Sequence, residues 1–186
     1  VLPCPTVSQA RMGLTAPEAE QYMTASDVVP GGLALIEFGG NDCDMPWKAV
    51  AENPTGEHLP KSPLPQFTAA LEALIQRVRD GGMQAMLAIP TPIDAVRYFG
   101  WVTKQLNPRK VLSFLGDVQY IYRWQERYAD AVLETAAKLA CPVLNLRSAF
   151  LEHRHYQELL CIDGIHPNAR GHGVLLNTLK TSLLHA

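Results

Sequence analysis

LALIEFGGND, residues Leu33–Asp42, is the stretch of sequence that decides the fold. Its first six residues form a short apolar run that ends in two glycines, a pattern typical of a strand buried in a parallel sheet. Gly39 and Gly40 allow the backbone to turn sharply where the strand ends. We therefore expect Asn41 and Asp42 at the carboxyl edge of the sheet, where ligands bind in such proteins.

On both sides of this stretch, short apolar runs alternate with longer segments of helical periodicity. Further strands are predicted at Thr6–Ala10, Ala85–Ile89 and Val143–Leu146. Helices are predicted at Thr15–Met23, Gln66–Asp80, Tyr120–Ala140 and Asn168–Leu184. Thr15 followed by Glu18 forms a capping box at the first helix, and Pro167 suits the first turn of the last one. The alternation predicts an α/β domain with helices on both faces of a parallel sheet.

Length and composition indicate a single globular domain over residues 1–186. The net charge of −2 is spread along the chain without a basic stripe, which argues against nucleic acid and anionic membrane partners. No apolar run approaches the roughly 20 residues of a membrane span. The four cysteines include no CxxC pair and favour free thiols in a reducing compartment, so a cytoplasmic location is expected.

Asn41 is the first candidate for chemistry. Its amide is a neutral donor at the edge of the sheet, suited to an oxyanion that forms only in the transition state. Gly13 lies after the first predicted strand, and its backbone N–H could serve the same oxyanion. The alternative for both is an ordinary turn, since Gly, Asn and Asp are common turn residues.

Asp163-Gly164-Ile165-His166 is the second candidate motif. A carboxylate three residues before an imidazole can accept its Nδ1–H, which fixes the tautomer and leaves Nε2 free to act as a base. The alternative is a polar loop in which Asp163 caps the helix that follows.

Taken together, these motifs resemble the SGNH (GDSL-type) hydrolases. Gly13 matches the second conserved block of that superfamily, Gly40-Asn41-Asp42 the third, and Asp163 with His166 the fourth. The resemblance spans the chain from about Ser8 to His172. It implies a flavodoxin-like three-layer α/β/α sandwich and a serine esterase that hydrolyses carboxylic esters of small molecules. Asp163, His166, Asn41 and Gly13 would be catalytic, with no metal and no cofactor.

The first block of that superfamily, a Gly-Asp-Ser, does not occur in this sequence. The nearest string, Gly116-Asp117-Val118, has no hydroxyl, and neither Ser8 nor Ser26 follows a Gly-Asp pair. In the superfamily this block follows a central strand, which here would lie between Thr6–Ala10 and Leu33–Phe38. We therefore expect an N-terminal extension of some tens of residues that supplies both the strand and the nucleophilic serine.

Two long segments without strands are expected beside the site. The Cys43–Pro65 loop begins directly after Asn41 and should overhang it, while Asp94–Trp124 is rich in aromatic residues. The aromatic segment forms either a local helical core or an apolar wall of a substrate pocket. Candidate substrate contacts are Gly40, Arg11 and Trp47.

Two other functions remain open from the sequence alone. Without a nucleophile, the domain could bind acylated sugars or a protein partner without turnover. A metal-dependent hydrolase is the other alternative, using Asp42, Asp44, His58, Asp163 and His166. The acyl and alcohol groups of the substrate and the oligomeric state are not indicated by any pattern.

Overall fold

The computed structural model describes residues 5–24 and 27–184. Its sheet contains the strands β1 (Leu33–Glu37), β2 (Gln84–Ala88) and β3 (Val143–Leu144), all parallel and in the order β1-β2-β3. The three predictions for these strands are confirmed, although β3 stops at Leu144 because Asn145 already caps the next helix through its bond from the Ser148 amide.

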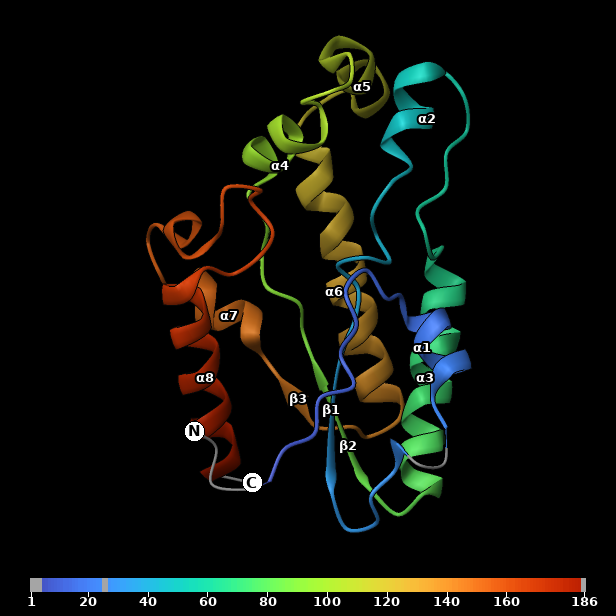
Figure 1. Cartoon of the computed structure of the whole chain (residues 1–186), viewed down its shortest axis with the longest axis vertical. Helices are drawn as coiled ribbons and strands as arrows, with labels where there is room; N and C mark the ends of the chain where they lie inside the picture. The colour runs from blue at the N-terminus through green and yellow to red at the C-terminus, as the bar shows by residue number, and fades with distance from the viewer. Residues whose placement is uncertain (1–4, 25–26, 185–186) are drawn as a thin grey trace.

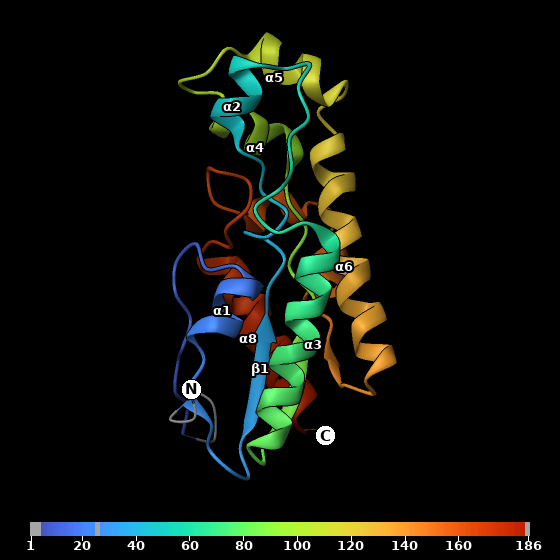
Figure 2. The ribbon, with the colours of Figure 1, turned by 90° about the vertical axis from the view of Figure 1, so that its right-hand side faces the viewer.

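One face of the sheet is covered by α1 (Ala16–Tyr22), α3 (Leu64–Asp80) and α6 (Tyr120–Lys138) (Figures 1 and 2). Helix α3 connects β1 to β2 and α6 connects β2 to β3, so both crossovers lie on the same side, as right-handed connections in one direction require. The main core lies under them and includes Ile36, Phe67, Leu71, Ile75, Leu87, Tyr128 and Val132.

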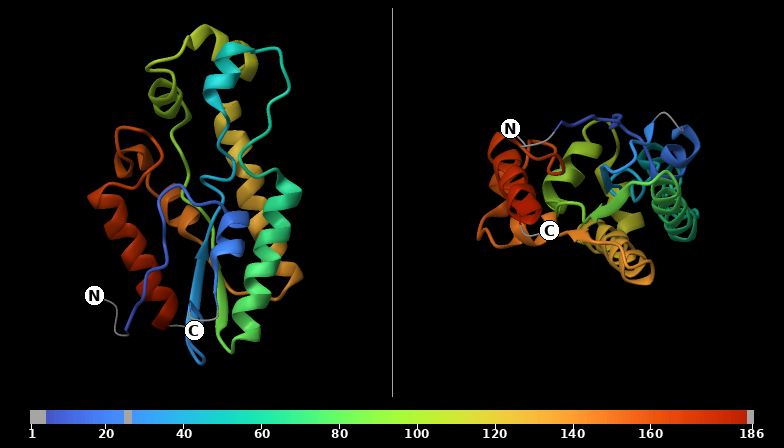
Figure 3. Two further views of the ribbon diagram at one scale, coloured as in Figure 1. Left: turned by 45° about the vertical axis from the view of Figure 1, so that its right-hand side comes forward. Right: turned by 90° about the horizontal axis from the view of Figure 1, so that it is seen from below.

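The opposite face is covered by α8 (Ala169–Leu184), which packs Leu179 against Met86, Ala88 and Leu144. Helix α7 (Leu146–Leu151) and the 3₁₀ turn η2 (Tyr156–Leu159) lie beside α8 and share a smaller apolar cluster with it. The right-hand view in Figure 3 shows the sheet between the two helical layers. The predicted α/β/α fold is therefore confirmed.

β1 forms a free edge of the sheet. Among the described residues it pairs with β2 alone. Its side chains alternate, so that Ile36 is 9% exposed towards the core, whereas Leu33 and Leu35 on the other face are 41% and 42% exposed. One edge and one apolar face of β1 are thus left without a covering element in the part of the chain that the structure describes.

The prediction of a strand at Thr6–Ala10 is wrong. These residues are exposed and have no regular secondary structure. In the left-hand view of Figure 3 they rise between α8 and β1. A strand exists only where a neighbour accepts and donates its backbone hydrogen bonds, and none of the described residues does so here.

A separate lobe stands beyond the carboxyl ends of the strands (Figure 1, top). It consists of α2 (Trp47–Glu52), α4 (Ala95–Val102) and α5 (Pro108–Leu115) and has its own apolar cluster around Ile93 and Val111. Of the two interpretations of Asp94–Trp124, the local helical core is supported, because Tyr98, Phe99 and Phe114 pack in this cluster. The Cys43–Pro65 loop, which contains α2, extends beyond the carboxyl end of β1.

The four predicted helices are all present, and each end lies within two residues of the predicted one. At α1, the Glu18 carboxylate accepts from the Thr15 amide at 2.9 Å, as expected of a capping box. Pro167 is a correction: α8 begins at Ala169, with Asn168 as its cap, so the proline precedes the helix.

The cysteines and the hydropathy of the helices can be compared with the sequence in the described residues. Cys43, Cys141 and Cys161 are free thiols, while Cys4 lies outside the described residues. None of the helices in residues 5–24 and 27–184 has the length and apolar character needed to cross a membrane.

The two faces of β1 predict different costs for neighbouring substitutions in this chain. Ile36→Ala should lower the free energy of unfolding by about 2–5 kcal/mol, because it leaves a cavity in the core. Leu35→Ala should cost less than about 1 kcal/mol, because its side chain is 42% exposed. Urea unfolding of both variants measures the difference; equal costs would contradict this assignment of the faces.

Candidate active site

The turn after β1 is held by the carboxylate of Asp42, which is fully buried. Its Oδ2 accepts from the Gly39 amide at 3.0 Å, and its Oδ1 accepts from the Ala16 amide at 2.9 Å. Gly39 has φ of +121°, a conformation that favours glycine. Burial raises the pKa of Asp42, although the two amide donors oppose this shift. Asp42 therefore joins the turn after β1 to the first residue of α1.

The Gly13 turn lies next to Asn41. The turn is closed by a bond from the Leu14 amide to the Arg11 carbonyl at 3.3 Å, with Gly13 at φ of +78°. The Asn41 Nδ2 donates to the Leu14 carbonyl at 3.4 Å. This bond uses one of the two Nδ2 hydrogens. The structure thus brings together two of the predicted oxyanion donors, Asn41 and Gly13, from segments far apart in sequence.

Neither of these two donors is fully used. Within the described residues, the Gly13 N–H donates to no other group, and Gly13 is exposed. The second hydrogen of the Asn41 amide has no acceptor there either, and Asn41 is half-buried. Unused donors at the carboxyl edge of a sheet are suited to an oxygen that becomes negatively charged.

Asp163 and His166 form the expected pair. The His166 Nδ1 lies 2.7 Å from the Asp163 Oδ2. The Asp163 Oδ1 accepts from the amides of Ile165 at 3.0 Å and His166 at 3.1 Å, so one carboxylate holds both the loop and the ring. Gly164 makes the turn possible with φ of +79°. We call residues 160–167 the dyad loop, which precedes α8.

The dyad has the electrostatics of a base and its orienting carboxylate. Burial acts to raise the pKa of Asp163, but the hydrogen bonds from His166 and from the Ile165 amide outweigh it and lower the pKa. Asp163 is therefore ionised near neutral pH and accepts the Nδ1–H of His166. The His166 side chain is 71% exposed, and its only hydrogen bond among the described residues is this one. Its Nε2 is free for a proton transfer.

The two halves of the site are not directly joined. No hydrogen bond or ion pair between described residues links Asn41 or Gly13 to Asp163 or His166. Both halves nevertheless lie on the carboxyl side of the sheet (Figure 1). One half directly follows β1, and the other precedes α8 at the end of that helix nearest the lobe. A substrate would have to bridge them.

The three predicted substrate contacts have different surroundings. Gly40 is exposed, and a Cβ added there would meet nothing within 4 Å. The Arg11 guanidinium lies 5.3 Å from the centre of the Tyr22 ring, beside α1. The indole N–H of Trp47 donates to Asp44 at 2.8 Å, so this residue helps to hold the lobe.

Asp44 fastens the lobe to the turn after β1. Besides the Trp47 bond, its Oδ1 accepts from the Tyr98 hydroxyl at 2.6 Å, and its Oδ2 pairs with Lys61 at 3.1 Å. Burial raises the pKa of Tyr98, with the nearby Asp44 charge as the next cause, so the hydroxyl stays a donor. Sequence patterns missed this network and the link made by Asp42, because Tyr98 and Ala16 lie far in sequence from the carboxylates that they contact.

The five residues of the metal-dependent alternative do not come together. The Asp42 carboxylate accepts hydrogen bonds from backbone amides, and the Asp44 carboxylate accepts from side chains of the lobe. The His58 Nε2 lies 2.8 Å from the Asn53 carbonyl oxygen. In the described part of the chain, no three side chains of His, Cys, Asp or Glu gather closely enough to hold a metal ion. The arrangement therefore gives this alternative no support.

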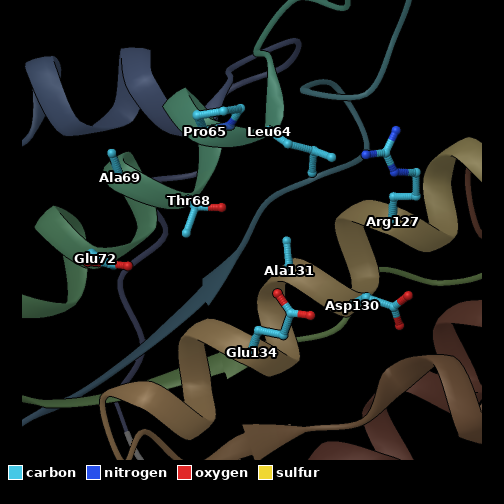
Figure 4. A pocket seen from close by; sticks show the side chains of 9 residues that line it. All are labelled: Leu64, Pro65, Thr68, Ala69, Glu72, Arg127, Asp130, Ala131 and Glu134. Carbon is cyan, nitrogen blue, oxygen red and sulfur yellow. The ribbon is translucent and has the colours of Figure 1, made fainter.

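A separate groove runs between α3 and α6 (Figure 4). The side chains that line it include Thr68, Glu72, Arg127, Asp130 and Glu134, none of which is a candidate site residue. Glu72 already pairs with Lys138 at 2.7 Å. The groove is therefore a feature of the outer helical surface and not part of the candidate site.

The buried bonds of Asp42 predict a marked cost for Asp42→Asn. Asparagine keeps only one acceptor oxygen, so one of the two buried amides loses its partner, and stability should fall by about 1–3 kcal/mol. Asp130→Asn is the matched control, because Asp130 is exposed, and it should change stability by less than about 0.5 kcal/mol. Guanidinium unfolding compares the two; an equally stable Asp42→Asn variant would contradict the proposed link.

Solved structures similar to this chain share its fold. The lipase/acylhydrolase from Enterococcus faecalis is 17% identical with a TM-score of 0.59, over 92% of this chain and 71% of that one. An acetylxylan esterase from Geobacillus stearothermophilus is 18% identical with a TM-score of 0.60, over 90% and 66%. A GDSL-like lipase from Bacteroides thetaiotaomicron is 16% identical with a TM-score of 0.62, over 93% and 72%. This chain thus spans about two thirds of their lengths.

Sequence comparison gives the family. No curated protein matches this sequence. The model of the GDSL-like lipase/acylhydrolase family matches residues 3–174, which is most of the chain and includes every candidate residue named above. Together with the fold and the positions of the two motifs, this match shows that the chain belongs to the GDSL-like lipase/acylhydrolase family and is an SGNH-type esterase domain.

Proposed function

We propose that the chain carries the acid–base and oxyanion groups of a serine esterase that cleaves carboxylic esters by a Ser-His-Asp mechanism. The observation that carries the proposal is the 2.7 Å bond between His166 and Asp163 at the same edge of the sheet as the unused donors of Asn41 and Gly13. A base oriented by a carboxylate and unused donors for the oxyanion are the two groups that acyl transfer requires besides its nucleophile.

The proposed reaction has two stages. The hydroxyl oxygen of a serine attacks the ester carbonyl carbon while the His166 Nε2 takes the hydroxyl proton. His166 then returns that proton to the departing alcohol, which leaves an acyl-enzyme that water hydrolyses by the same steps. Asp163 keeps the ring oriented and stabilises its positive charge. The Asn41 amide and the Gly13 N–H donate to the carbonyl oxygen as it becomes negative.

The free edge of β1 supports a position for the serine. A parallel strand paired there would lie next to β1, and its carboxyl end would emerge beside the turn that carries Asn41. The exposed Leu33 and Leu35 on the uncovered face of β1 would be available to a helix that follows such a strand. We propose that such a strand is encoded upstream of Val1 and ends in a Gly-Asp-Ser, with the helix after it.

The similar structures support a broad chemical class of substrate. Similar structures are described as an acetylxylan esterase and as lipases, which supports small acyl esters of carbohydrates or lipids as candidates for this chain. The exposed position of His166 and the open space at Gly40 are consistent with a shallow site that admits the ester from solvent.

An oxyanion role for Asn41 predicts a specific kinetic loss. In the protein expressed with its upstream coding sequence, Asn41→Ala should lower kcat for ester hydrolysis by about 10²–10³-fold with little change in KM. Asn177→Ala is the control, because Asn177 is exposed on α8. A loss in Asn41→Ala of less than about threefold would remove Asn41 from the mechanism, since lost oxyanion donors cost far more.

Labelling with a fluorophosphonate tests the nucleophile. The expected result is one covalent adduct on a serine upstream of Val1, found by peptide mass spectrometry and lost in His166→Ala. A reading frame without an upstream Gly-Asp-Ser, together with no labelling, would contradict the esterase and leave a non-catalytic binding domain. Inhibition by EDTA without labelling would instead favour a metal-dependent hydrolase.

A further inference from the structure

The N-terminal end of α4 contacts the dyad loop from the side of the lobe. The Asp94 amide donates to the Gly164 carbonyl at 2.8 Å, inside the motif that carries the catalytic pair. Just before the loop, the Tyr156 hydroxyl donates to the Ile93 carbonyl at 3.0 Å. Ile165, between Gly164 and His166, packs against the apolar cluster of the lobe. The dyad loop is therefore attached to the start of α4 by the Asp94 bond and to the lobe by Ile165.

Arg97 makes the most extensive of these contacts. Its Nη1 donates to the carbonyl of Gln157, in η2, at 3.1 Å, and to the carbonyls of Cys161 at 3.0 Å and Leu160 at 3.4 Å, at the start of the dyad loop. The guanidinium is itself held in place by Asp94, whose Oδ2 lies 3.5 Å from the Arg97 Nε. A planar cation that meets several carbonyls fixes the direction of the backbone as well as its distance.

Gly164 shows how closely the loop is pressed onto α4. A Cβ at this position would lie 2.8 Å from the Asp94 carbonyl oxygen and 2.9 Å from both the Arg97 Cβ and the Tyr98 nitrogen. Two of these three atoms are backbone atoms, at the N-cap and in the first turn of α4, so they cannot shift without moving the helix. The residue also has φ of +79°. Only glycine fits both conditions, so the contact between the loop and α4 is built into the dyad motif itself.

We propose that Arg97 is a positioning residue for the Asp163–His166 pair. The His166 ring is exposed, and Asp163 is its only hydrogen-bond partner in the described structure, so the ring takes its orientation from the loop alone. Asp163 in turn takes its position from the backbone that Arg97 and Gly164 hold against α4. The lobe thus sets the direction of the base. This inference rests on the proposed function for its catalytic meaning, but its geometry can be tested separately.

The tautomer of His166 is the direct readout. Asp163 accepts the Nδ1–H, so in the wild-type chain the neutral ring should carry its proton on Nδ1. Nitrogen-15 NMR at alkaline pH distinguishes the two ring nitrogens, and His166→Gln identifies the signals among those of the other histidines. A residue with a merely structural role would change stability without changing this tautomer in the folded protein.

Arg97→Met keeps the aliphatic stem and removes the guanidinium. We expect the Nδ1–H tautomer of His166 to change from the major to the minor form in the folded variant, and Arg97→Lys to restore it in part. Arg123→Met is the control, because Arg123 pairs with Asp117 on the surface at 2.8 Å and contacts no part of the loop. In the protein that carries the nucleophile, Arg97→Met should lower kcat by about 10–10²-fold while KM stays within about twofold.

Gly164→Ala provides a second variant with a close match. Gly116 also has positive φ, +71°, but a Cβ there would meet nothing within 4 Å. Gly164→Ala and Gly116→Ala therefore share the backbone strain, and only the first pushes the loop away from α4. We expect both to lose stability and only Gly164→Ala to lose the Nδ1–H tautomer.

The outcomes separate this proposal from the proposed function. A wild-type tautomer in folded Arg97→Met and Gly164→Ala would overturn the positioning role, whatever the activity of the protein. Loss of the tautomer in these variants, with wild-type protein that hydrolyses no ester, would support the positioning role and reject the esterase. Equal effects of Gly164→Ala and Gly116→Ala on the tautomer would show that strain, not the contact with α4, is responsible, and would also overturn it.

Discussion

The buried carboxylate of Asp42 is the constraint on which the oxyanion side of the site depends. It accepts hydrogen bonds from the backbone amides of Gly39, at the end of β1, and of Ala16, at the start of α1, which lies 26 residues before Asp42. A buried carboxylate is tolerated only where donors meet it, so the two segments cannot separate without a large energetic cost. Asn41 and the Gly13 turn are neighbours because Asp42 holds their two supports together.

The base side of the site depends on a different part of the molecule. The sheet places the dyad loop at its carboxyl edge, but the lobe fixes the direction of the loop through Arg97 and the close approach of Gly164. The lobe is also fastened to the turn after β1 through Asp44 and Tyr98. Two small groups of polar contacts thus connect both halves of the site to a lobe that lies outside the main core.

Local sequence patterns predicted much of the fold and the dyad, but they could not predict the contacts between residues far apart in sequence. The spacing of Asp163 and His166 and the apolar periods of β1, α3 and α6 depend on near neighbours, so the sequence sufficed for them. The strand predicted at residues 6–10 failed because a strand needs a partner, which no local pattern can supply. Arg97 was missed because its carbonyl partners lie at least 60 residues away.

A crystal structure of the protein with its upstream segment, labelled by a phosphonate, tests the central claim most directly. The phosphoryl oxygen of the adduct takes the place of the oxyanion. It should accept from the Asn41 Nδ2 and the Gly13 N–H at about 2.7–3.1 Å, with the His166 Nε2 facing the serine oxygen. An adduct whose oxygen points away from Asn41 and Gly13, or which His166 does not approach, would contradict the account.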